Sequence, residues 1–113
     1  MENNELISTI VELNNNLIKR TNEIATLYAN NDINKASERL SFLIEDFSPF
    51  IEAVDLYKEL FDIDVIEELQ DKLQLILNEL EEEDYLLISE LLLYELLPLL
   101  EDIREHFTNG EVG

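Results

Sequence analysis

Acid–base or metal chemistry in this chain would have to come from one histidine and 27 acidic residues. His106 is the only histidine and cysteine is absent, so a thiolate zinc site, a cysteine nucleophile and a Glu-x-x-His di-iron pair all lack their ligands. The residue three positions before His106 is Ile103 rather than a glutamate. We therefore expect His106 to lie at the C-terminal end of a helix, where the helix dipole and nearby Asp102 stabilise its charged form.

Two glutamates, Glu90 and Glu95, interrupt the apolar run of residues 85–100 and are the candidates for a catalytic carboxylate pair. Burying carboxylates without partners is costly, so we expect each of them to mark a solvent-facing strip of a helix. The acids at 81–84 would fan around a helix end, and Asp62-x-Asp64 lacks the glycine and the distal glutamate of a calcium loop. The sequence therefore predicts no enzyme activity, no cofactor and no metal site.

The segment that begins at His106 resembles the H-x-x-K-G motif of histidine phosphotransfer domains, which are also helical bundles. Asn109 stands at the basic position of that motif. Because this departure removes one of the few defining residues of the motif, we do not predict phosphotransfer.

Composition favours one helical domain. The chain has 113 residues, 46% of them apolar, and only two glycines and two prolines interrupt it. We expect residues 1–107 to form a single domain and residues 108–113 to be a frayed tail. The N-terminus lacks the basic region of a signal peptide, and the run 85–100 is shorter than the roughly 20 residues of a membrane span. These features predict a cytoplasmic protein.

Charge is strongly negative and unevenly distributed. The net charge is −20, with −2 over residues 1–40, −8 over residues 41–78 and −10 over residues 79–113. Nucleic acids and acidic membranes should be repelled by this charge, whereas a basic protein would be attracted.

Apolar residues spaced by three and four positions predict four helices, over residues 4–29, 33–61, 64–82 and 84–107. Short connections between long helices imply antiparallel neighbours, so the predicted fold is all-α, an antiparallel four-helix bundle with long, kinked second and fourth helices. The first helix is expected to face the core with Leu6, Ile10, Leu13, Leu17, Ile24 and Leu27.

Aspartates and prolines indicate how the helices begin and bend. Asp32, Asp64 and Asp84 each precede a helix and are predicted N-caps. Pro49 either breaks the second helix or kinks it, and the unbroken apolar spacing across it favours a kink. Pro98 should bend the fourth helix in the same way.

Four basic residues should meet near the first turn. A hairpin that turns at residues 30–32 brings Lys35 and Arg39 of the second helix close to Lys19 and Arg20 of the first. Most of the positive charge would then gather at one end of an otherwise anionic molecule.

The stretch DYLLISELLLYELLPLL, residues 84–100, resembles a pattern of small uncharacterised bacterial proteins, D-x-x-L-I-x-D/E-L-L-x-Y-E-L-x-P-x-L. This resemblance covers about one sixth of the chain and implies no activity. In size, acidity and helical character, the whole chain is also loosely similar to the export chaperones of flagellar and type III secretion systems. That similarity implies a chaperone or adaptor role and carries over no binding residues.

A helix that is apolar on nearly every side must be covered by several neighbours, and in so small a protein a second chain can supply one of them. We therefore predict a non-enzymatic, acidic helical protein–protein interaction module, adaptor-like or chaperone-like, that forms a homodimer. The expected contact residues are Leu92, Leu93, Leu96 and Leu100. Two alternatives are an acidic decoy of a nucleic-acid-binding protein and a bundle that binds a small molecule or a metal.

Overall fold

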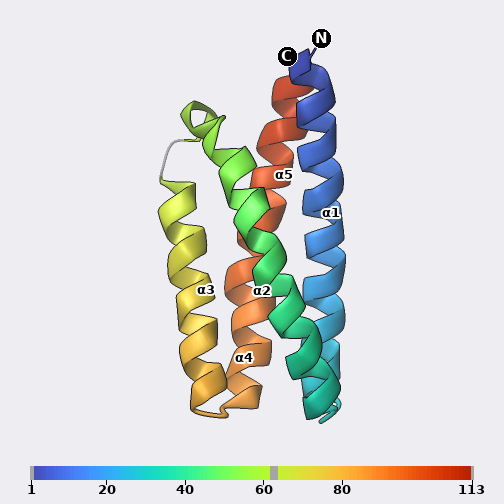
Figure 1. Cartoon of the computed structure of the whole chain (residues 1–113), viewed down its shortest axis with the longest axis vertical. Coiled ribbons are helices and arrows are strands. Elements are labelled where there is room, and N and C mark those ends of the chain that lie inside the picture. The colour runs from blue at the N-terminus through green and yellow to red at the C-terminus, as the bar shows by residue number, and fades with distance from the viewer. Residues whose placement is uncertain (1, 62–63, 113) are drawn as a thin grey trace.

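The computed structural model describes the backbone of residues 2–61 and 64–112, and the side chains of residues 5–61 and 64–108. In this part of the chain, four helices pack side by side as an antiparallel bundle of 45 × 22 × 20 Å (Figure 1). They are α1 (Glu2–Ala29), α2 (Ile33–Asp55), α3 (Val65–Glu81) and a last helical segment made of α4 (Tyr85–Leu91), η2 (Leu92–Leu96) and α5 (Leu97–Val112). The predicted fold class is confirmed.

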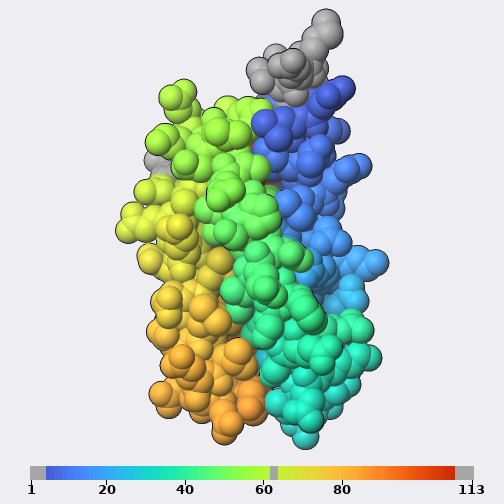
Figure 2. Space-filling view, in the orientation of Figure 1, coloured from blue at the N-terminus to red at the C-terminus, as the bar shows by residue number. Residues whose placement is uncertain are grey.

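Neighbours in sequence are also neighbours in space. α1 lies between α2 and the last helical segment, and α3 lies between α2 and that segment (Figure 1). On the face shown in Figure 2, the side chains of α2 close the space between α1 and α3. In the described residues, no helix is both long and apolar enough to cross a membrane.

The face that α1 turns to the core differs from the predicted one. Ile10, Leu17 and Ile24 are buried as expected, but Leu6 is 36% exposed. Leu13 and Leu27 are only partly buried. The centre of the buried face includes two polar residues, Asn14 and Thr21, which are fully enclosed. Because α1 contacts α2 on one side and the last helical segment on the other, its buried stripe is broader than a single seam.

α2 keeps the predicted spacing of three and four positions between its buried apolar residues. Its buried residues are Ala36, Leu40, Leu43, Phe47, Phe50 and Val54, and the helix passes unbroken through Pro49. Pro49 is exposed, so the carbonyl that its missing N–H leaves free can bond to water.

The end of α2 differs from the prediction. The helix ends at Asp55, not near Phe61, because the amides of Leu56 and Tyr57 bond to carbonyls three residues back and tighten the last turn. The short 3₁₀-helix η1 (Lys58–Leu60) follows. Tyr57 and Phe61 still reach the core, where both rings pack edge-on against Phe107.

Two of the three predicted aspartate caps are confirmed. Asp64 accepts a hydrogen bond from the backbone N–H of Glu67 at 3.1 Å, and Asp84 accepts one from Leu87 at 3.2 Å. Asp32 holds the N-cap position of α2, but its side chain makes no capping hydrogen bond. Its predicted position is therefore confirmed, and the capping hydrogen bond expected of it is not. Residues 62–63 of the predicted second turn lie outside the described residues.

The last helical segment is distorted immediately before Pro98. The N–H of Leu97 bonds to the carbonyl of Leu92, five residues back, which makes η2 a single π-helical turn. Pro98 lacks an N–H, and its ring crowds the turn that precedes it, so the extra residue of a π turn relieves the strain. The predicted bend is therefore present and lies within 92–96. α5 continues to Val112, five residues beyond the expected end, and the frayed tail stays a prediction.

Candidate functional site

Three of the four leucines predicted to contact a partner lie inside the protein's own core. Leu92, Leu96 and Leu100 have no exposed surface, and Leu93 is partly buried. The last helical segment contacts α1 and α3, so the chain itself covers the sides that were assigned to a second copy. Leu92, Leu96 and Leu100 therefore cannot bind a partner in this conformation, and the prediction is corrected.

Other apolar residues of this segment face the solvent. Leu86 is 72% exposed and Tyr94 is 71% exposed. Glu90 lies between them in sequence and is also exposed. The same segment therefore combines a buried leucine-rich side with a mixed apolar and acidic outer side.

The titratable candidates do not converge on a common site. Glu95 is exposed and pairs with Lys72 at 3.3 Å. His106 bonds through Nδ1 to the carbonyl oxygen of Asp102 at 2.9 Å, and because a carbonyl only accepts, Nδ1 carries the proton. The carboxylate of Asp102 lies 3.8 Å from the same nitrogen, and the ring of Phe61 packs on the imidazole. The expected proximity of Asp102 to His106 is confirmed.

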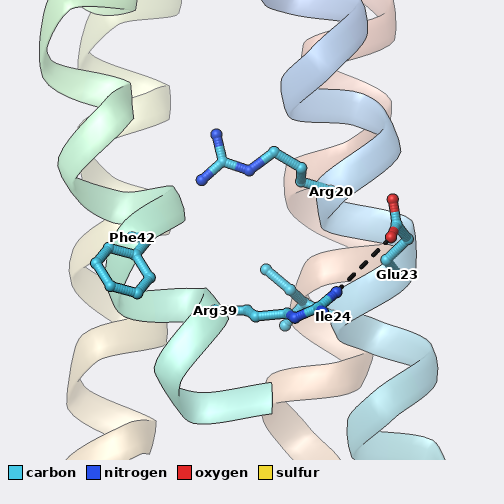
Figure 3. Close-up of a pocket in the computed structure, with 5 residues that line it drawn as sticks. All are labelled: Arg20, Glu23, Ile24, Arg39 and Phe42. Carbon is cyan, nitrogen blue, oxygen red and sulfur yellow. Dashed lines mark ion pairs between the residues drawn. The ribbon is translucent and has the colours of Figure 1, made fainter. Parts of the chain in front are cut away.

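Phe42, which is 57% exposed, lines a surface hollow. The hollow has a volume of about 230 Å³ and lies between α1 and α2. Figure 3 shows its lining: Arg20, Glu23 and Ile24 come from α1, and Arg39 and Phe42 come from α2.

A second hollow of about 330 Å³ shares Glu23 and Arg39 with the first. Its other lining residues are Asn22, Thr26 and Leu27. Because the two hollows share a wall, we treat them as one surface and call the eight lining residues the α1–α2 groove. Most of the accessible lining of both hollows is apolar.

The two arginines of the groove are held very differently. Arg20 donates to Asp46 at 2.8 Å and to Asn16 at 3.2 Å. Arg39 lies 3.9 Å from a carboxylate oxygen of Glu23, and within the described part of the chain it donates no side-chain hydrogen bond. Figure 3 shows the two side chains reaching across the groove from opposite helices. Arg20 and Arg39 therefore line the same hollow, and the gathering of all four basic residues near the first turn stays a prediction.

A further hollow of about 510 Å³ lies between the end of α2 and the first turn of α3. Four of its lining residues are charged: Asp55, Lys58, Asp64 and Glu67. Within residues 5–61 and 64–108, no group of three or more acidic or histidine side chains is arranged to hold a metal ion.

The signal that could have identified Phe42 from the sequence is its phase. It lies one residue before Leu43 and two after Leu40, so it falls off the buried stripe of α2. An aromatic residue off the stripe of an amphipathic helix is expected to be exposed, and such a residue is a candidate contact.

Comparisons with known proteins match one family model, over residues 5–106. Neither the curated proteins nor the solved structures yield a match. The chain belongs to the family described as domain of unknown function DUF8042.

Proposed function

We propose that this chain is a non-enzymatic, acidic helical protein-interaction module that holds a segment of a partner protein in the α1–α2 groove. One observation carries the proposal: the ring of Phe42 is 57% exposed at the edge of an apolar hollow whose lining includes Ile24. Burying a large apolar side chain yields about 1.5–3 kcal/mol, so covering Phe42 would contribute substantially to binding. Aromatic and arginine side chains are also enriched among residues that dominate binding energies.

An adaptor or chaperone-like role in the cytoplasm is the form of this function that we propose. The similarity of the chain to flagellar and type III export chaperones in size, acidity and helical character supports it. So does the position of the groove between two helices, where an amphipathic helix of a partner can lie.

The absence of enzyme activity is part of the same proposal. It is supported by the positions of the groups that catalysis would need. Glu90 and Glu95 are exposed, and Nδ1 of His106 is engaged by the carbonyl of its own helix. General acid–base catalysis needs such groups within reach of one substrate.

The acidic decoy remains the alternative, and it would use a different surface. Residues 43–113 carry a net charge of −18, whereas the α1–α2 groove contains two arginines. A decoy would bind a basic protein through the acidic residues of 43–113, and its affinity for that protein would fall steeply as the salt concentration rises. Binding that depends on Phe42 and changes little with salt would exclude it.

Site-specific cross-linking tests the proposed function. A photo-reactive phenylalanine analogue would replace Phe42 in one experiment and Leu75, which is 41% exposed on α3, in the control. We expect a protein that cross-links from position 42 and not from position 75. After purification, that protein should bind the wild-type chain and lose about tenfold or more in affinity for Phe42→Ser. Leu75→Ser should bind normally.

Two results would contradict the proposal. One is equal cross-linking from both positions. The other is a purified partner that binds Phe42→Ser as tightly as it binds wild type.

A further inference from the structure

The α1–α2 groove differs in charge from the rest of the chain. Residues 19–42, which supply all eight lining residues, contain four basic and three acidic residues. Their net charge is therefore +1, and adding Asp46, whose carboxylate holds Arg20, brings it to zero, whereas the rest of the chain carries −20. At physiological ionic strength the Debye length is about 8 Å, so the groove's own charges outweigh distant ones for a bound group.

Within the groove, Arg39 is the cation that is free to exchange its partner. Its side chain is 49% exposed, and that of Glu23 is 47% exposed. The two lie 3.9 Å apart, at the limit of an ion pair, and exposed pairs of this kind contribute little stability. Arg20 is a contrast, because a short bond to Asp46 and a second bond to Asn16 hold it in place.

Guanidinium groups bind carboxylates with two parallel hydrogen bonds when the geometry permits. Arg39 retains this capacity, because Glu23 is too distant to take up a paired hydrogen bond. The apolar side chains of Ile24 and Phe42 line the same hollow. A cation beside an apolar surface is complementary to a carboxylate beside an apolar group.

From these observations we infer that the groove binds a segment of a partner protein that places a carboxylate next to an apolar anchor. Glu23 occupies the position of that carboxylate while the groove is empty and therefore competes with the partner. This inference rests on the proposed function and specifies the chemistry of the bound segment. The carboxylate pairs with Arg39, and the anchor covers Ile24 and Phe42.

Hydrocinnamate, which carries a phenyl ring and a carboxylate, serves as the probe, and its uncharged amide is the comparison. Both are titrated into the 113-residue chain, and binding is followed by the chemical shifts of the backbone N–H groups. We expect hydrocinnamate to bind in the millimolar range and to shift residues of the groove. The amide should bind more weakly, by about two- to fivefold, because it makes no ion pair with Arg39.

Three variants separate the contributions. Glu23→Gln removes the internal competitor. It should tighten the binding of hydrocinnamate by about two- to fivefold and leave the affinity for the uncharged amide probe unchanged. Arg39→Gln should abolish the preference for the carboxylate. Glu12→Gln is the matched control, because it removes the same charge from the same helix roughly 16 Å away, and it should change nothing.

Phe42→Ser distinguishes this inference from the proposed function. It should weaken both probes, because both need the apolar surface. Suppose that hydrocinnamate and its amide have the same affinity for wild type, and also for Glu23→Gln, and that Phe42→Ser weakens both. The groove then accepts apolar segments, and the carboxylate inference is wrong. If neither probe shifts residues of the groove, the inference and the proposed docking site both fail.

Discussion

The phenolic oxygen of Tyr28 lies 2.9 Å from the hydroxyl oxygen of Ser37, and this hydrogen bond joins the end of α1 to the start of α2. The ring of Tyr28 also stacks on Tyr85 of α4, with 5.8 Å between the ring centroids. One buried side chain therefore connects three helices at the end of the bundle where the first and last turns meet.

Replacing Tyr28 with phenylalanine should lower the free energy of unfolding by about 0.5–1.5 kcal/mol, because the ring stays and the hydrogen bond is lost. Ser37→Ala removes the same bond from the other side. Urea denaturation of both single variants and the double variant measures the coupling, and the double variant should cost less than the sum of the two. Strict additivity would mean that the bond contributes nothing to stability.

Tyr28 also makes stability depend on pH at the alkaline end. Burial raises the pKa of its phenol above 10.0, the bond to Ser37 lowers it, and the nearby Tyr85 raises it. The pKa of Tyr28 is higher in the folded than in the unfolded protein. The neutral phenol therefore contributes its full stabilisation below pH 10.0, and this contribution is lost as the pH rises through the raised pKa. Above pH 10.0 the wild type should lose stability faster than Tyr28→Phe. Parallel stability curves would contradict this.

The helix caps provide a matched pair of aspartates. Asp84 caps α4 through its side chain, whereas Asp32 occupies the same position before α2 without a side-chain hydrogen bond. Asp84→Ala should therefore destabilise the protein by about 1 kcal/mol, and Asp32→Ala should cost clearly less. Asp84→Asn should retain stability, because asparagine caps as well as aspartate does. Equal thermal shifts for the two alanine variants would show that helix-dipole effects dominate.

A strained residue closes the turn between α3 and α4. Glu83 has a φ of 58°, in the left-handed region that costs an L-residue roughly 1–2 kcal/mol. Glu83→Gly should remove this cost and raise the free energy of unfolding by about 1 kcal/mol. Asn31, with a φ of 64°, occupies the corresponding place after α1, and Asn31→Gly should gain less because asparagine tolerates this conformation.

Charge is a second difference between these variants, because Glu83→Gly also removes one acid. Glu82→Gln controls for it, since Glu82 has ordinary right-handed angles. If Glu82→Gln stabilises the protein as much as Glu83→Gly, repulsion among the acids explains the gain, and backbone strain does not.

Features set by local chemistry were predictable from the sequence. The stripe of α2 from Ala36 to Val54 and the caps at Asp64 and Asp84 depend on spacing and on neighbouring backbone groups. The continuity of α2 at Pro49 was also predictable, because the stripe keeps its phase on both sides.

Features set by packing were not predictable in the same way. The π turn at 92–96 depends on how Pro98 and the buried leucines fit against α1 and α3 together. The burial of Leu92, Leu96 and Leu100 also depends on packing. We predicted that they contact a partner, but helices of the same chain cover them completely. The groove was not predicted, because Phe42 and Arg39 form it only together with residues of α1, and the spacing within α2 does not show which residues of α1 lie beside them.

Self-association stays a prediction, and we propose the exposed residues Leu86 and Tyr94 of the last helical segment as its contacts, in place of the buried leucines. Two copies carrying −20 each repel one another, so salt should favour dimers by screening the charge. Sedimentation at high micromolar concentration should show a dimer fraction that grows with salt. The variant that combines Leu86→Ser and Tyr94→Ser should remain monomeric. A wild-type chain that is monomeric at every salt concentration would refute the homodimer.

The buried amide of Asn14 is the feature of the core with the largest expected energetic cost. Its Oδ1 and Nδ2 atoms are enclosed, and neither has a hydrogen-bond partner among the described residues. Thr21, two turns further along the same face, is also fully buried, but its hydroxyl donates to the carbonyl of Leu17 at 2.7 Å. An enclosed polar group without a partner costs about 1–3 kcal/mol, whereas a bonded one costs little.

Asn14→Leu should therefore raise the free energy of unfolding by about 1–2 kcal/mol. It replaces the unsatisfied amide with an apolar group of the same branched shape. Thr21→Val is the matched control. It replaces a satisfied hydroxyl and should leave stability unchanged or lower it slightly. Urea denaturation measures both, and an unchanged slope shows that the variants differ only in stability. If Asn14→Leu is destabilising instead, the amide is bonded to a buried water in solution, and the polar centre of α1 is a satisfied network.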